Sequence, residues 1–132
     1  MKLLFFVLLF YGCSLKGTKS DNGFHEVPKN ALEVFNNYGC KNCHTLPPTD
    51  YTDYGREMLK KGYGCISLQT LAKKHALLGD ARKVFIENGC SKCHNPDGKG
   101  IGDKNLTKFG LEIERKGLGC VETFKQLLGE SQ

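Results

Sequence analysis

One pentapeptide occurs twice in this chain of 132 residues, as Cys40-Lys41-Asn42-Cys43-His44 and as Cys90-Ser91-Lys92-Cys93-His94. The two copies are 50 residues apart, and the same offset pairs Val34-Phe35 with Val84-Phe85. Downstream the offset grows to 55, where residues 60–65 match residues 115–120. The five additional residues fall in the glycine-rich segment 95–105, as expected for a loop insertion. The sequence therefore contains two copies of one unit, with a boundary near residues 78–79.

Each copy has the apolar pattern of a small helical unit. Apolar residues recur at helical spacing, Asp80 is a candidate N-cap, and a glycine follows the first helix of each copy. We predict helices over 31–35, 54–61 and 67–78 in the first copy and over 81–88, 109–116 and 121–128 in the second. No stretch alternates as a strand does. The prediction is a mostly α fold of two short tandem units, 29–78 and 79–132.

The composition limits the classes of function. Hydrophobic residues make up 39% of the chain, so the core is thin, and so small a domain usually needs a disulfide, a metal or a bound cofactor. The seven cysteines are the residues that can supply such a link. The net charge of +5 is a mild excess without a long basic run, which gives little support to a nucleic-acid partner.

The first twelve residues have the pattern of a secretion signal. Lys2 is followed by a short apolar stretch, residues 3–11, which is too short for a membrane-spanning helix. Gly12-Cys13 resembles the end of a bacterial lipoprotein signal, although Phe10-Tyr11 departs from that pattern. Ordinary cleavage nearby and an uncleaved anchor are the alternatives. We expect a periplasmic or other extracytoplasmic protein, lipid-anchored through Cys13, with residues 13–28 as a tether.

The repeated pentapeptide is the attachment signal for c-type haem. Two thiols add across the two vinyl groups of the porphyrin, and the adjacent histidine becomes the proximal iron ligand. The sequence therefore predicts two covalently bound haem c groups, held by Cys40, Cys43, Cys90 and Cys93, with His44 and His94 as the proximal ligands. The alternatives are a zinc site made by the four cysteines, which leaves the repeated histidine unexplained, or two disulfides among them.

Residues 79–100 resemble the opening of a class I cytochrome c. That family has an N-terminal helix with a glycine and an aromatic residue, then the haem motif, then a glycine-rich loop. Gly79 and Phe85 match those positions, as does Phe35 in the first copy, whereas residues 102–106 lack the proline of the family's Gly-Pro-x-Leu loop. The resemblance covers about residues 29–130 as two shortened copies. It implies helices packed around each haem, with a C-terminal helix lying across the first.

The distal iron ligands remain open. The family usually supplies a methionine, but Met58 is matched by Ile113 in the second copy, so Met58 is more simply a core residue. His25 and His75 each lie fifteen residues before the first haem cysteine of their copy, and they are the remaining histidines. We predict that these two histidines are the distal ligands.

The last two cysteines have a repeated flanking sequence. Cys65 and Cys120 each follow Lys-Gly-x-Gly and precede the last helix of their copy, near the place where the family has its methionine. A disulfide between them suits an oxidising compartment and is our preferred prediction. Ligation of iron by either thiolate is the alternative.

These features predict an electron carrier and not an enzyme. Two fixed ligands on each iron would exclude substrate and keep reorganisation small. Lys60, Lys61, Arg115 and Lys116 lie at equivalent places and are a candidate docking face for an acidic redox partner, although lysines at a helix end are common without such a role. The alternative function is a haem subunit of a periplasmic redox enzyme, for example one of sulfur-compound oxidation, with a Cys-ligated or open haem.

Overall fold

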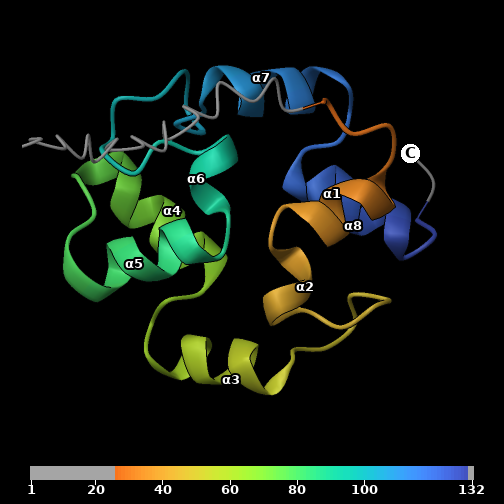
Figure 1. Ribbon diagram of the computed structural model, residues 1–132, viewed down its shortest axis with the longest axis horizontal. Coiled ribbons are helices and arrows are strands. Elements are labelled where there is room, and N and C mark those ends of the chain that lie inside the picture. Colours follow the sequence, from red (N-terminus) through yellow and green to blue (C-terminus); the bar gives the residue numbers. More distant parts are fainter. Residues whose placement is uncertain (1–25, 131–132) are drawn as a thin grey trace, which may run out of the picture.

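The computed structural model describes residues 26–130. Its eight helices (Figure 1) are α1 (Ala31–Asn37), α2 (Cys40–Cys43), α3 (Asp53–Lys60), α4 (Cys65–Lys74), α5 (Gly79–Glu87), α6 (Cys90–Cys93), α7 (Lys108–Arg115) and α8 (Cys120–Leu127). The described residues contain isolated bridges but no strand, which confirms the mostly helical fold. None of these helices has the length and hydropathy to cross a membrane. The signal 1–12, Cys13 and His25 lie outside the described residues.

Side-chain caps fix where several helices begin. Asn30 caps α1, and Thr52 and Thr107 cap α3 and α7; each side-chain oxygen accepts a hydrogen bond from the backbone N–H three residues on. The cap predicted at Asp80 is wrong, because Leu78 is the N-cap of α5. Asp80 lies in the first turn, where its carboxylate faces the positive end of the helix dipole.

The predicted positions of the longer helices agree with the structure to within a few residues. The last helix of each copy begins earlier than expected, at Cys65 and at Cys120, and α4 ends at Lys74. The short helices α2 and α6 were not predicted. The folded part also begins before the expected end of the tether at residue 28, because Val27 packs on the core and Pro28 is buried.

The two copies exchange their last helices. The first helix, α1, packs on α8 of the second copy, and α5 packs on α4 of the first copy (Figure 1). One core cluster contains Ala31, Val34, Ile113 and Leu118, and the other contains Leu68, Ala72, Leu77 and Phe85. Each cluster therefore draws side chains from both copies. A last helix does pack against a first helix, as the resemblance implies, but the contact joins one copy to the other.

A threonine and a glycine join each short motif helix to the next helix of its own copy. Thr52 Oγ1 donates a hydrogen bond to the backbone oxygen of Asn42 at 2.6 Å, and Thr107 Oγ1 donates to the backbone oxygen of Lys92 at the same distance. At Gly110 the backbone approaches the Cys93 carbonyl so closely that a Cβ would overlap it, and the equivalent glycine of α3 is placed in the same way. Both copies thus fix their motif with one local arrangement.

Replacing Thr107 with alanine is expected to lower the free energy of unfolding by about 1–2 kcal/mol, the usual effect of losing an N-cap. The change removes the cap of α7 and the bond to α6 together. Chemical denaturation of the purified protein measures the effect. Thr70, which is exposed on α4 and makes no side-chain hydrogen bond within the described residues, is the matched control and should change stability by less than about 0.5 kcal/mol. Equal effects at both positions would rule out the cap as the cause.

Candidate cofactor-attachment site

The two pentapeptides adopt the same backbone conformation. In each, the two cysteines are the first and last residues of a four-residue helix, so their thiols lie on one face at the i, i+3 spacing. The histidine ends the helix in an extended conformation, with φ −117° and ψ 145° at His44 and φ −121° and ψ 144° at His94. The backbone N–H of each histidine donates to the carbonyl of the first cysteine at 2.9 Å. Each motif therefore presents two thiols and one imidazole from one rigid turn.

A left-handed glycine begins each motif helix and brings the two copies together. Gly39 has φ +87°, and a Cβ at this position would overlap the carbonyl oxygen of Asn88 in the other copy. The buried Asn88 side chain accepts a hydrogen bond from Asn42 at 3.1 Å and donates one to the Tyr54 hydroxyl at 3.0 Å. Gly89, with φ +73°, lies less closely against the backbone of Tyr38, where a Cβ would be 3.1 Å from the carbonyl oxygen. The two motif helices thus begin at one crossing point between the copies.

The six cysteines of the described chain are free thiols, so the expected Cys65–Cys120 disulfide is not formed in the structure. Burial first, and the charges of neighbouring cysteines second, raise the pKa of Cys40, Cys90 and Cys93 to about 12. The neighbours that act on these motif thiols include Cys65 and Cys120, so the first residues of α4 and α8 lie within electrostatic reach of both motifs. At neutral pH the motif thiols are protonated.

His94 is buried and held from both sides. Its Nδ1 lies 2.9 Å from the backbone oxygen of Lys104, and its Nε2 lies 3.1 Å from the side-chain amide of Gln69 on α4. A carbonyl oxygen only accepts hydrogen bonds, so Nδ1 carries the proton and the Nε2 lone pair faces α4. Burial lowers the pKa of His94, which favours the neutral imidazole that a metal requires.

His44 is half-buried between aromatic rings. Its ring centroid lies 4.9 Å from that of Tyr51 and 4.7 Å from that of Phe124, the second contact being edge-on. Phe124 on α8 is the repeat equivalent of Gln69 on α4, since the two positions differ by the offset of 55. Each motif histidine therefore faces the last helix of the other copy.

The donor set fits covalent haem attachment in its chemistry and order. Two thiols on one face are followed directly by an imidazole whose Nε2 is unprotonated in the second copy. Gln69 now approaches that nitrogen, so its flexible side chain has to turn aside before Nε2 can bind iron. Within residues 26–130, no three histidine, cysteine or acidic side chains converge as a ready metal cluster.

The remaining predicted ligands have different surroundings. Met58 is buried on α3, as expected for a core residue. His75 is exposed at the end of α4, so Gln69, and not His75, faces the Nε2 atom of His94 in the structure. His25 is outside the described residues. The assignment of His25 and His75 to the irons therefore stays a prediction.

The four basic residues that are a candidate docking face do not lie together in the structure. Lys60 and Lys61 lie at the end of α3, whereas Arg115 and Lys116 lie at the end of α7, on the opposite side of the molecule (Figure 1). Lys61 is also paired with Glu57 at 2.6 Å. The two copies are oriented differently in space, so residues at equivalent positions of the repeat can lie on different faces of the molecule.

Sequence reasoning missed the groups that position the motif histidines. These are the Lys104 carbonyl, Gln69, Phe124, and the threonines at the start of α3 and α7 that donate hydrogen bonds to the motif helices. The repeated threonine, Thr52 and Thr107, was a usable signal, because it has the offset of 55 and precedes a predicted helix. Searches against protein families, characterised proteins and solved structures found no match to this chain.

Proposed function

We propose that the chain is a dihaem c-type cytochrome that carries electrons between redox partners outside the cytoplasm. The observation that carries this proposal is the duplicated motif, in which thiols and imidazole recur on the same backbone at both sites. A haem bound there would supply one-electron redox chemistry. Cys40 and Cys43 would hold one group and Cys90 and Cys93 the other, with His44 and His94 as iron ligands. The chain would act as a carrier rather than as an enzyme.

The local structure supports a rigid attachment turn at each site. The threonine bonds and the close glycine contact fix each motif helix against α3 or α7. A carrier benefits from such rigidity, because ligands that move little keep the reorganisation energy small. His25 and His75 are the distal ligands that we propose, and the lipid-anchored, extracytoplasmic location through Cys13 belongs to the same proposal.

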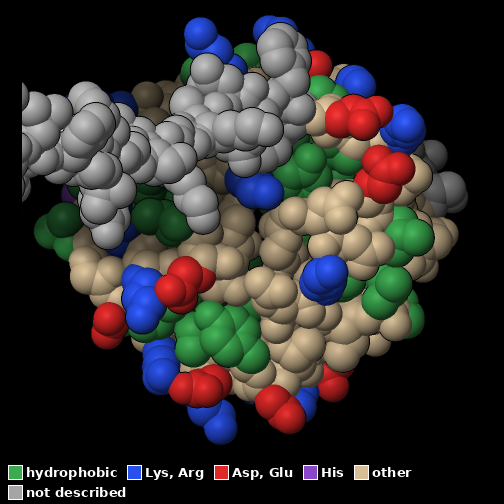
Figure 2. Space-filling view, in the orientation of Figure 1, with side chains coloured by type: hydrophobic (Ala, Val, Ile, Leu, Met, Phe, Trp, Pro, Cys, Tyr) green, Lys and Arg blue, Asp and Glu red, His purple; other side chains and the backbone are tan. Residues whose placement is uncertain are grey.

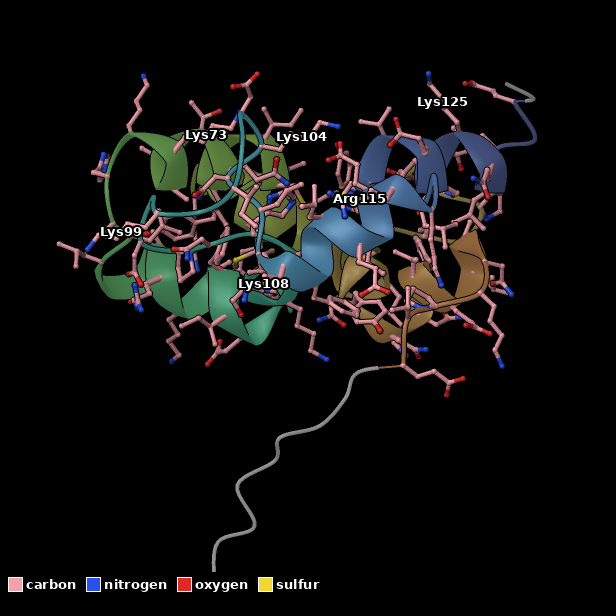
Figure 3. All side chains as sticks on the ribbon, turned by 90° about the horizontal axis from the view of Figure 1, so that it is seen from above. Lys73, Lys99, Lys104, Lys108, Arg115 and Lys125 are labelled. Carbon is pink, nitrogen blue, oxygen red and sulfur yellow. The ribbon has the colours of Figure 1, made fainter. Side chains whose placement is uncertain are left out.

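The partner that we propose is an acidic redox protein. Figure 3 shows the side of the molecule that carries α7, where the labelled basic residues are Lys73, Lys99, Lys104, Lys108, Arg115 and Lys125. Lys104 is paired with Glu114, and the other five form no ion pair among the described residues. The face shown in Figure 2 mixes acidic and basic side chains. Unpaired basic residues favour docking of a negative surface and speed encounter at low salt.

Mass spectrometry of the exported protein tests the proposal. The chain is expected to retain two haem masses after acid-acetone extraction, because thioether bonds resist it. A Cys90→Ala/Cys93→Ala variant should retain one haem. A Cys65→Ser/Cys120→Ser variant, which leaves both motifs intact, should retain two and is the matched control. A single haem in the parent protein, or bound zinc in its place, would refute the proposal.

Cys65 and Cys120 are free thiols, so either could ligate a haem iron. A second candidate function is therefore a haem subunit of a periplasmic redox enzyme with a Cys-ligated or open haem. A visible spectrum separates the two functions. A low-spin spectrum that carbon monoxide leaves unchanged supports electron transfer alone. A high-spin component, or a carbon monoxide adduct, supports the catalytic role.

A further inference from the structure

The two motif histidines differ in their hydrogen bonding. His94 donates its Nδ1 proton to the Lys104 carbonyl at 2.9 Å. The ring of His44 makes no hydrogen bond within the described residues, although Thr49 occupies the position equivalent to Lys104. The rings of Tyr51 and Phe124 hold His44 instead. Both copies therefore have the histidine, but among residues 26–130 only the second copy has a carbonyl that accepts a hydrogen bond from its ring.

The cause lies in the loop that follows each motif. The second copy has five more residues there, and Asn105, which is buried with φ +52°, secures the loop from inside. Its Oδ1 accepts from the Gly100 N–H at 2.7 Å, and its Nδ2 donates to the Asn95 carbonyl at 2.6 Å. These bonds hold Asn105 in place, and with it the Lys104–Asn105 peptide group that contains the Lys104 carbonyl. In the first copy the exposed Asp50 takes the place of Asn105 and bonds to the next backbone N–H.

We infer that the two haem sites differ in redox potential, with the His94 site the lower, and that Asn105 is the positioning residue that keeps it so. The inference rests on the proposed function. A hydrogen bond from the far nitrogen to a carbonyl raises the basicity of a ligating imidazole, which stabilises ferric iron. With haem bound at both motifs, the lower potential would let an electron pass from the site held by His94 to the site held by His44, one iron being oxidised as the other is reduced.

The last helices act in the same direction. Gln69 has to turn aside from Nε2 when iron binds, but its polar amide remains on α4 beside the His94 site, and a polar group favours the more highly charged ferric state. Phe124 presents an apolar ring to the His44 site, which disfavours that state. The hydrophobic or polar shell around a metal site is one of the levers that set its potential. The substitution of Phe124 for Gln69 between the copies thus widens the difference.

Two features of the His94 site oppose this direction. His94 is the more deeply buried ring, and Lys73 and Lys104 add positive charge near it. Lys104 is paired with Glu114, so its charge is largely offset. Lys73 is exposed, and solvent screens its effect. The hydrogen bond from His94 to the Lys104 carbonyl acts directly on the ligating ring. Hydrogen-bond partners of metal ligands typically change metal affinity by roughly 10–100-fold.

A redox titration of the holoprotein, followed by its visible spectrum, tests the inference. The parent protein should titrate in two resolved one-electron waves. Asn105→Gly keeps the backbone freedom for positive φ but removes both side-chain bonds, so it should raise the lower wave towards the upper one. A change of roughly tenfold in the ferric-to-ferrous equilibrium is expected at that site alone. Asn105→Asp, which retains the acceptor for Gly100, should raise it less.

Asp97→Asn is the matched control, because it breaks the exposed Arg82–Asp97 ion pair of the same loop without touching Asn105. Both waves should stay where they are in that variant. One unresolved wave in the parent, movement of the upper wave in Asn105→Gly, or equal shifts in the control would overturn the inference and leave the carrier function standing. Haem is counted on the same samples, and a count other than two overturns the proposed function and this inference with it.

Discussion

Replacing Gly39 with alanine is expected to destabilise the protein by about 2–5 kcal/mol. A left-handed φ of +87° costs an L-residue about 1–2 kcal/mol, and overpacking adds about 1–3 kcal/mol. The overlap here is with the backbone carbonyl of Asn88, which cannot rotate aside as a side chain can. Total stabilities of small domains are about 5–15 kcal/mol, so the loss is a large fraction. Urea denaturation followed by circular dichroism measures it.

Gly62 offers a control that separates the two costs. It has a φ of +77°, but no atom lies within 4 Å of the position that a Cβ would take, so alanine there meets backbone strain without overlap. We expect Gly62→Ala to lose only about 1–2 kcal/mol. If Gly39→Ala and Gly62→Ala lose the same amount, the crossing between the copies is not the close contact described above.

Neither copy is expected to fold when it is made alone. A fragment of residues 79–130 keeps Phe85 but lacks Leu68, Ala72 and Leu77, which enclose it in the intact chain. It also keeps Ile113 without the α1 side chains against which that residue packs. Exposing one large apolar side chain costs about 1.5–3 kcal/mol, and the fragment exposes several. Its circular dichroism should therefore show little helix and no cooperative thermal transition.

Mixing the two fragments provides the corresponding control. Residues 26–78 supply α1 and α4, so an equimolar mixture should regain helix that neither fragment has alone. A point change in the shared core, Ala72→Asp, should prevent this recovery, because it places a charge at a fully buried position. Cooperative unfolding of either fragment by itself would show that the copies are autonomous domains after all.

The repeat and the helix pattern predicted the fold class and the positions of most helices. They did not predict the exchange of last helices, because α4 and α8 have equivalent apolar patterns and either could pair with α1. The choice depends on how the connections run in space, which the periodicity of one segment does not contain. Asp80 was misassigned as a cap for a related reason: an acidic residue favours both the cap and the first turn.

The candidate site was predictable where its chemistry is carried by side chains at fixed spacing. The four motif cysteines, His44 and His94 followed from the pentapeptide alone. The Lys104 carbonyl did not, because a backbone oxygen has the same chemistry at every residue and only the loop conformation selects it. Gln69 was missed since it reaches His94 from the other copy, 25 residues away in the chain.

The exchange of last helices also sets an order of assembly. The contact of α4 with α5 joins neighbours in the sequence, so it can form early, whereas α1 must find α8 at the far end of the described chain. Contacts between distant residues form late because closing a long loop costs entropy before any contact repays it. A chain emerging N-terminus first thus presents its first motif long before α8 arrives to cover it. The motif that is synthesised first, with His44, is therefore the one whose surroundings are completed last, when α8 packs against it.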